Sequence, residues 1–201
     1  MTLDRRQALR TLAFGSVGAV AAPAWAEKLA ALARDHAEHA PATAAPAAAE
    51  ATPWKAKVLD SHQNDTVVTL SELIIPQTET PGARAARVNE FIDLVLSDAE
   101  ERDRKEFLKG LAWMDARSQE LFGTDFLAAS ADQQTALLTI LASPRNKAFE
   151  DQVGIDFFKA IKALTITGYY TSEIGMKQEL GDDGQLFFLE DPGCTHPEHK
   201  A

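Results

Sequence analysis

The segment Cys194-Thr-His196-Pro-Glu198-His199 groups residue types that bind transition metals. Thiolate, imidazole and carboxylate side chains are the usual protein ligands of zinc and iron. A closed site needs ligands that approach the ion from several directions, so neighbouring residues alone are hard to arrange around a metal. Cys194, His196 and His199 are therefore a candidate metal site, and a stand-alone periplasmic metal-binding protein is one function that the sequence leaves open.

Cys194 is the single cysteine among 201 residues. One thiol excludes an internal disulfide framework and a four-cysteine zinc site. In an oxidising compartment such a residue can be a free thiol, a metal ligand or one half of a disulfide to a partner chain. The sequence leaves these three states open.

Motifs that hold a nucleotide cofactor or activate a nucleophile are absent from the sequence. It contains no glycine-rich dinucleotide fingerprint, no phosphate-binding loop, no nucleophile elbow and no haem-attachment motif. Acidic and basic residues alternate over residues 100–106, which is typical of a solvated helical face. His36 and His39 form an H-x-x-H pair that we interpret as solvated. We therefore expect no catalytic residue and no cofactor bound by this chain.

Apolar residues recur at helical spacing in five segments, which predicts a mainly α fold with about five core helices. The expected helices begin at Asn64 or Asp65, Val88, Glu100, Ser130 and Phe149, and they end near Pro76, Leu96, Leu121, Pro144 and Thr167. The spacing places Asn89 and Asp93 on the wet side of the second helix. Gly123 suits a helix C-cap, Ser130 with Gln133 forms a capping box, and residues 168–172 are expected to form a turn.

These helices define a compact domain over residues 58–189, with less regular segments on both sides. Residues 27–57 are rich in alanine and proline and are expected to form an extended arm or linker, although Glu27–His39 could be a short helix. Residues 185–189 could be a short strand or an extended docking segment. Residues 190–201 are expected to be a polar C-terminal tail.

The first 26 residues have the pattern of an export signal. A charged start is followed by an uncharged run over residues 11–26 and by the small-residue site Ala24-Trp25-Ala26, which predicts cleavage after Ala26. The pair Arg5-Arg6, with Leu9 and Arg10 after it, resembles a twin-arginine (Tat) signal. We therefore expect export by the Tat translocase to the periplasm. The apolar run is too short to span a bilayer, so the mature form should have no membrane span.

The charge balance excludes some partners. The chain has 20 basic and 30 acidic residues and a formal charge of −10, which argues against nucleic acid and against anionic lipid as a binding partner. Removing the signal takes away Arg5, Arg6 and Arg10 with Asp4, so the mature chain is more acidic still.

Two aromatic groups are candidates for a partner interface. Phe157, Phe158, Tyr169 and Tyr170 could pack in the core or anchor a partner. The run Leu186-Phe187-Phe188 is harder to bury so late in a small domain, and an exposed apolar patch usually marks a binding surface. Cys194 joins this candidate interface as a possible disulfide link.

Two blocks of the sequence resemble the gluconate 2-dehydrogenase subunit 3 family. The first runs from Leu73-Ile74-Ile75-Pro76 through Pro81-Gly82-Ala83 to Asp93, and the second runs from Phe157 through Gly168-Tyr169-Tyr170-Thr171-Ser172. The resemblance covers roughly residues 67–189, and a twin-arginine start is typical of that family.

The resemblance implies an accessory role rather than an active site. Members are small subunits of periplasmic dehydrogenases for sugars, sugar acids or related alcohols. Their large subunit, of the glucose-methanol-choline oxidoreductase type, holds FAD, and a cytochrome c subunit often accepts the electrons. The small subunit carries the Tat signal and escorts its partner through export. The alternative that the residues leave open is a stand-alone metal-binding or ligand-binding helical protein.

Overall fold

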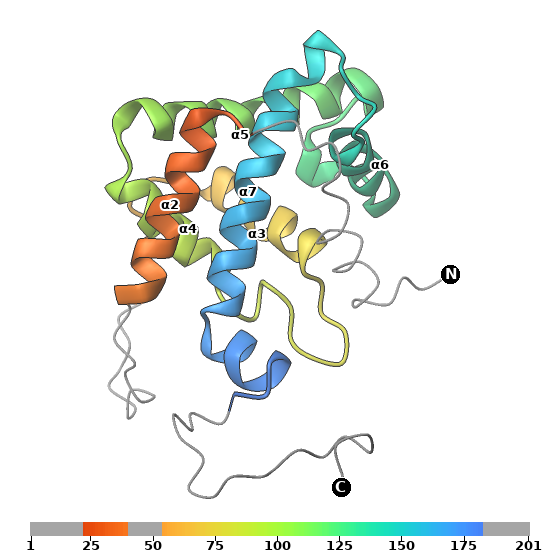
Figure 1. Ribbon diagram of the computed structural model, residues 1–201. Coiled ribbons are helices and arrows are strands. Elements are labelled where there is room, and N and C mark those ends of the chain that lie inside the picture. Colours follow the sequence, from red (N-terminus) through yellow and green to blue (C-terminus); the bar gives the residue numbers. More distant parts are fainter. Residues whose placement is uncertain (1–21, 40–53, 183–201) are drawn as a thin grey trace, which may run out of the picture.

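Helices make up most of the two ranges that the structure describes, residues 22–39 and 54–182. In this computed structural model, six α-helices are present in those ranges (Figure 1): α2 (Ala24–His39), α3 (Ser61–Ile74), α4 (Val88–Asp98), α5 (Glu101–Phe122), α6 (Ala131–Ala142) and α7 (Gln152–Tyr170). Three short elements join them: η1 (Phe126–Ala128), η2 (Phe149–Asp151) and the π-helix η3 (Ile174–Glu179). The predicted mainly α fold is confirmed, with α3 to α7 in place of the five expected helices.

Helix α7 forms the centre of the bundle, because α2, α3, α4, α5 and α6 all pack against it (Figure 1). Its inner stripe includes Phe157, Ile161 and Leu164, each at most 1% exposed. The expected start at Phe149 was wrong, since residues 149–151 form the separate turn η2. The expected turn over residues 168–172 was also wrong in its first half, because α7 continues to Tyr170 and buries Tyr169 completely.

Helices α5 and α7 approach each other closely at Gly110. A Cβ atom added at this glycine would lie 2.4 Å from the Cβ and ring atoms of Phe157. The Phe157 ring also meets Phe107 edge to face, with ring centroids 5.1 Å apart. The absent side chain of Gly110 is therefore what allows the two longest helices to bring these rings together.

Side-chain caps fix several helix ends. Helix α3 begins one turn earlier than expected from Asn64 or Asp65, because Asp60 is its cap: Gln63 N donates to Asp60 Oδ1 over 2.8 Å, and Asp60 N donates to Gln63 Oε1 over 3.0 Å. The predicted capping box of Ser130 is confirmed in α6, and the predicted Gly123 C-cap of α5 is confirmed by its φ of 75°.

The carboxylate of Asp93 is buried in the core, so its predicted place on the wet side of α4 was wrong. Its side chain is 1% exposed. Asp93 Oδ2 accepts from Lys57 N over 2.7 Å, and Oδ1 accepts from Val58 N over 3.0 Å and Leu59 N over 2.9 Å. The chain that leads into α3 thus supplies three backbone donors. Their hydrogen bonds replace those that the carboxylate would make with water.

Helix α2 lies along α7 and also contacts α4 and α5 (Figure 1). Leu29 and Ala33 are at most 1% exposed. Lys28 joins α2 to the start of α5, because its Nζ lies 3.0 Å from Glu100 Oε2 and 3.5 Å from Asp103 Oδ2. The helical option for residues 27–39 is therefore the one observed, and these residues pack as part of the domain. Residues 40–53 of the expected arm lie outside the described ranges.

Candidate partner-binding surface

The loop between α3 and α4 lies at the end of the bundle where α7 finishes (Figure 1). Two backbone amides of this loop donate to the carboxylate of Glu72: Gln77 N over 2.8 Å and Arg84 N over 2.9 Å. Ala83 N donates to Ile75 O over 2.9 Å, and the side chain of Ala83 is fully buried. A single carboxylate near the end of α3 therefore organises the loop, which explains why a proline- and glycine-containing segment holds one conformation.

The end of α7 is bonded directly to this loop. Tyr169 is 0% exposed, and its hydroxyl donates to Pro81 O over 2.7 Å. The rings of Tyr169 and Tyr170 meet at 89° with centroids 5.2 Å apart. The two sequence blocks, 88 positions apart at this hydrogen bond, thus form one surface at the end of the bundle.

The π-helix η3 extends this surface beyond α7. Ser172 Oγ accepts from Gly175 N over 3.0 Å, which links the end of α7 to the first turn of η3. Thr80 Oγ1 donates to Glu179 Oε2, so η3 is tied to the same loop. Met176 is 37% exposed and Leu180 is 60% exposed. The end of the bundle therefore presents apolar side chains on a segment whose backbone is fixed.

The structure divides the predicted interface residues into three groups. Phe157 is 1% exposed and Tyr169 is 0% exposed, so both rings belong to the core and neither touches a partner in this conformation. Phe158 and Tyr170 are half-buried and pack at the edge of the core. The remaining predicted interface residues, Leu186, Phe187, Phe188 and Cys194, lie outside the described ranges.

The residues predicted for export and for metal binding fall mostly outside the described ranges, namely Arg5, Arg6, Leu9, Arg10, Cys194, His196 and His199. Ala24 and Ala26 are described and lie in the first turn of α2, where Ala26 is 2% exposed. In residues 22–39 and 54–182, no cluster of three or more His, Cys, Asp or Glu side chains could hold a metal ion. Over the same residues, no helix is both long and apolar enough to cross a membrane.

An open pocket of about 300 Å³ lies between α2 and the junction of α4 and α5. Its charged lining consists of Lys28, Asp98, Glu100 and Asp103. Lys28 already pairs with Glu100 and Asp103, and Asp98 lies 3.1 Å from His36 Nε2. The charges of the pocket are thus used to hold α2 in place, and their arrangement is that of an ion-paired seam between helices.

The pair of His62 and Asp115 connects α3 to α5. The two residues are 53 positions apart, so no local sequence pattern predicts this contact. His62 Nε2 lies 2.7 Å from Asp115 Oδ2, and Asp115 Oδ1 accepts from Phe126 N over 3.1 Å. The hydrogen bond to Asp115 raises the pKa of His62 above its ordinary value of 6.5. This imidazole therefore stabilises the contact in its charged form.

We expect the contribution of His62 to stability to decrease as the pH rises. Because the pKa is raised by folding, the stabilisation is complete below the unfolded value of 6.5 and is lost as the pH passes through the folded value. The difference in melting temperature between wild type and His62→Gln should be larger at about pH 5.5 than at about pH 8.5. The same comparison with Lys55→Gln, at an exposed position, should not change with pH, and a constant difference for His62→Gln would contradict the expectation.

Comparison with known proteins identifies one relationship. Residues 61–183, which are more than half of the chain, match the family model described as Gluconate 2-dehydrogenase subunit 3. No curated protein and no solved structure matches the chain. The match includes both sequence blocks that meet at the end of α7, and it excludes α2.

Proposed function

Since this chain belongs to the gluconate 2-dehydrogenase subunit 3 family, we propose that it is the non-catalytic small subunit of a periplasmic dehydrogenase for a sugar or sugar acid. Membership places it among the accessory subunits of gluconate 2-dehydrogenase-like complexes. In the proposed complex the large subunit is of the glucose-methanol-choline type, holds FAD and binds the substrate. A cytochrome c subunit is the proposed electron acceptor.

The family match is the observation that carries this proposal. The geometry supports it at the end of the bundle, where the loop around Ala83 and the end of α7 are bonded through Tyr169 and Pro81. Met176 of the adjoining η3 and Leu180, the residue after it, expose apolar surface. Exposed apolar side chains on a fixed backbone suit a lasting contact with another subunit.

The proposal includes a role in export. The Arg5-Arg6 pair resembles the signal of the Tat pathway, which carries proteins that are already folded. In this scheme the small subunit binds the folded flavoprotein, which has no signal of its own, and takes it through the Tat translocase to the periplasm. One chain thus provides both the export signal and the surface that holds the cargo.

Co-expression with the large subunit tests the proposal. In the double variant Arg5→Lys and Arg6→Lys, we expect the flavoprotein to stay in the cytoplasm with its FAD bound, because the translocase no longer recognises the escort. The flavoprotein in each compartment is measured by immunoblot and by dehydrogenase activity.

The matched control is the double variant Arg34→Lys and Arg102→Lys, two exposed arginines of the helical domain. It should leave export unchanged. If the flavoprotein of the Arg5 and Arg6 variant reaches the periplasm at the level of wild type, the escort role is wrong. If the two chains do not form a complex at all, the subunit assignment itself is wrong.

A further inference from the structure

Phe149 has the most exposed aromatic side chain among the described residues. Its side chain is 92% exposed, whereas Trp54 reaches 37% and Phe107, Phe126 and Phe157 are at most 1% exposed. A single exposed apolar residue is common on protein surfaces and has no meaning by itself. The feature that sets Phe149 apart is the network of polar contacts that fixes the loop on both sides of it.

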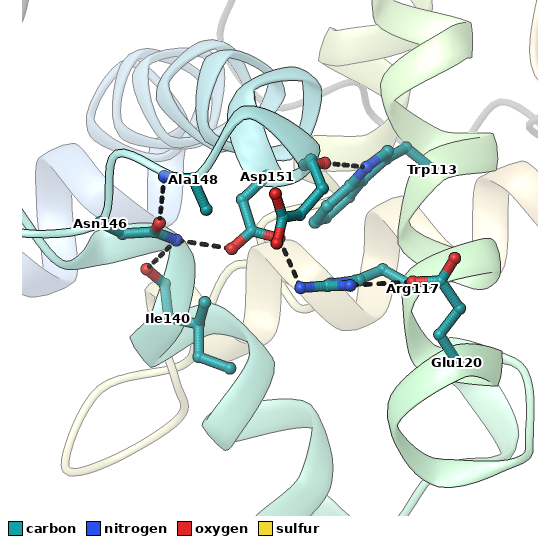
Figure 2. Close-up of polar contacts among 8 residues, drawn as sticks. Trp113, Arg117, Glu120, Ile140, Asn146, Ala148 and Asp151 are labelled. Carbon is teal, nitrogen blue, oxygen red and sulfur yellow. Dashed lines mark hydrogen bonds and ion pairs between the residues drawn. The ribbon is translucent and has the colours of Figure 1, made fainter.

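Asn146 fixes the part of the loop before Phe149 (Figure 2). Its side-chain amide nitrogen donates to Ile140 O over 3.2 Å and to Asp151 Oδ2 over 2.8 Å. Its side-chain oxygen accepts from Ala148 N over 3.0 Å. One amide therefore joins the end of α6, the residue before Phe149 and the start of α7.

Helix α5 fixes the part of the loop after Phe149 (Figure 2). Arg117 Nη2 lies 3.0 Å from Asp151 Oδ1, and Asp151 is 4% exposed. Trp113 Nε1 donates to Glu150 O over 3.1 Å. The backbone at Phe149 is therefore already fixed in the free protein. Binding through its ring then loses little conformational entropy, because the loop does not have to become ordered.

The same loop has a local positive charge. Arg145 and Lys147 are exposed, and neither forms an ion pair with a described residue. This differs from the chain as a whole, whose formal charge is −10. The surface that complements this loop is an apolar pocket with carboxylates around it.

We propose that the Phe149 loop, residues 144–149, is a docking site for the large subunit, with the ring inserted in an apolar pocket that carboxylates border. This inference rests on the proposed function and adds a contact at the end of α7 opposite to Met176 and Leu180. A large aromatic ring that becomes fully buried is the usual form of an interface hot spot. Arg145 and Lys147 orient the approach and face the carboxylates of the partner.

The affinity of the purified wild-type chain for the purified large subunit is the first measurement, by isothermal titration calorimetry. Phe149→Ala should raise the dissociation constant by at least about thirtyfold, the lower limit for a hot-spot residue. The double variant Arg145→Glu and Lys147→Glu should also bind more weakly, and its affinity should depend less on the salt concentration. Trp54→Ala, which removes an exposed aromatic outside the loop, should leave the affinity unchanged.

The Phe149→Ala variant should fold normally, because its ring has almost no contacts to lose, and an unchanged melting temperature checks this. If wild type binds and Phe149→Ala binds equally well, the docking role is wrong while the proposed function stands. If wild type does not bind the large subunit, the proposed function fails, and this inference fails with it. If Phe149→Ala loses binding only to phosphatidylglycerol vesicles, the loop contacts membrane and the inference is wrong.

Discussion

Replacing Asp93 with alanine should lower the free energy of unfolding by about 3–5 kcal/mol. The carboxylate is 1% exposed and accepts from the backbone amides of Lys57, Val58 and Leu59. Its removal leaves those donors without an acceptor: the amide of Leu59 is buried, the other two are part-buried, and an unsatisfied buried donor costs about 1–3 kcal/mol. Water can enter part of the space that the carboxylate leaves. The expected loss is therefore smaller than three times the upper cost of about 3 kcal/mol for one unsatisfied donor.

Urea unfolding followed by circular dichroism measures the effect of the Asp93 change. Asp65→Ala is the matched control, because Asp65 is an exposed carboxylate on α3, and it should change stability by less than about 0.5 kcal/mol. The stability of Asp93→Asn should lie between those of wild type and Asp93→Ala. The amide of asparagine keeps one acceptor oxygen, but its NH₂ group faces a backbone N–H that also donates. A loss below about 1 kcal/mol for Asp93→Ala would show that the three amides find other partners.

Gly110→Ala should also destabilise the protein, by about 2 kcal/mol, although alanine is the better helix former. The added Cβ would lie 2.4 Å from Phe157 Cβ as well as from its ring. A ring can rotate away, but Cβ moves only with the backbone, so α5 and α7 must separate. This strain exceeds the gain of about 1 kcal/mol that replacing glycine brings inside a helix.

The control for Gly110→Ala is Gly168→Ala in α7. There the nearest atom to an added Cβ is Phe91 Cδ1 at 2.6 Å, while Phe91 Cβ is 3.4 Å away, so a rotation of the ring relieves the contact. Gly168→Ala should therefore destabilise the fold less than Gly110→Ala. Both variants are compared by melting temperature and urea titration. Equal stability of Gly110→Ala and wild type would mean that the two helices are not in close contact.

The sequence predicted the helices well where each one is defined by its own residues. The apolar stripe of α4, the capping box at Ser130 and the Gly123 cap depend on neighbours within one or two turns, and all three are confirmed. Asp93 could not be placed in the same way, because its partners approach from residues 57–59, outside the helix. Periodicity assigns every carboxylate to solvent unless a distant donor is known.

The errors around α7 have a common physical origin. Phe149 fits the apolar spacing of the helix, but the Asn146 and Asp151 contacts hold residues 149–151 in a separate turn and point the ring outward. Gly168 looks like a helix terminator in sequence, yet it allows Phe91 of α4 to approach the helix. In both cases tertiary contacts override the local pattern. The same explanation applies to two of the predicted interface residues, because the rings of Phe157 and Tyr169 could anchor a partner but are buried in the core.

The position of α2 has a consequence for where this domain can be cut. The family match begins at residue 61, at the first residue of α3. A chain shortened to that limit loses Leu29 and Ala33 from the surface of α7, and it also loses the amides that satisfy Asp93. The stretch that matches the family model and the stretch that packs together in the structure therefore differ in length. A fragment that keeps the contacts of α2 and of Asp93 should therefore begin at Ala24 rather than at residue 61, where the family match begins.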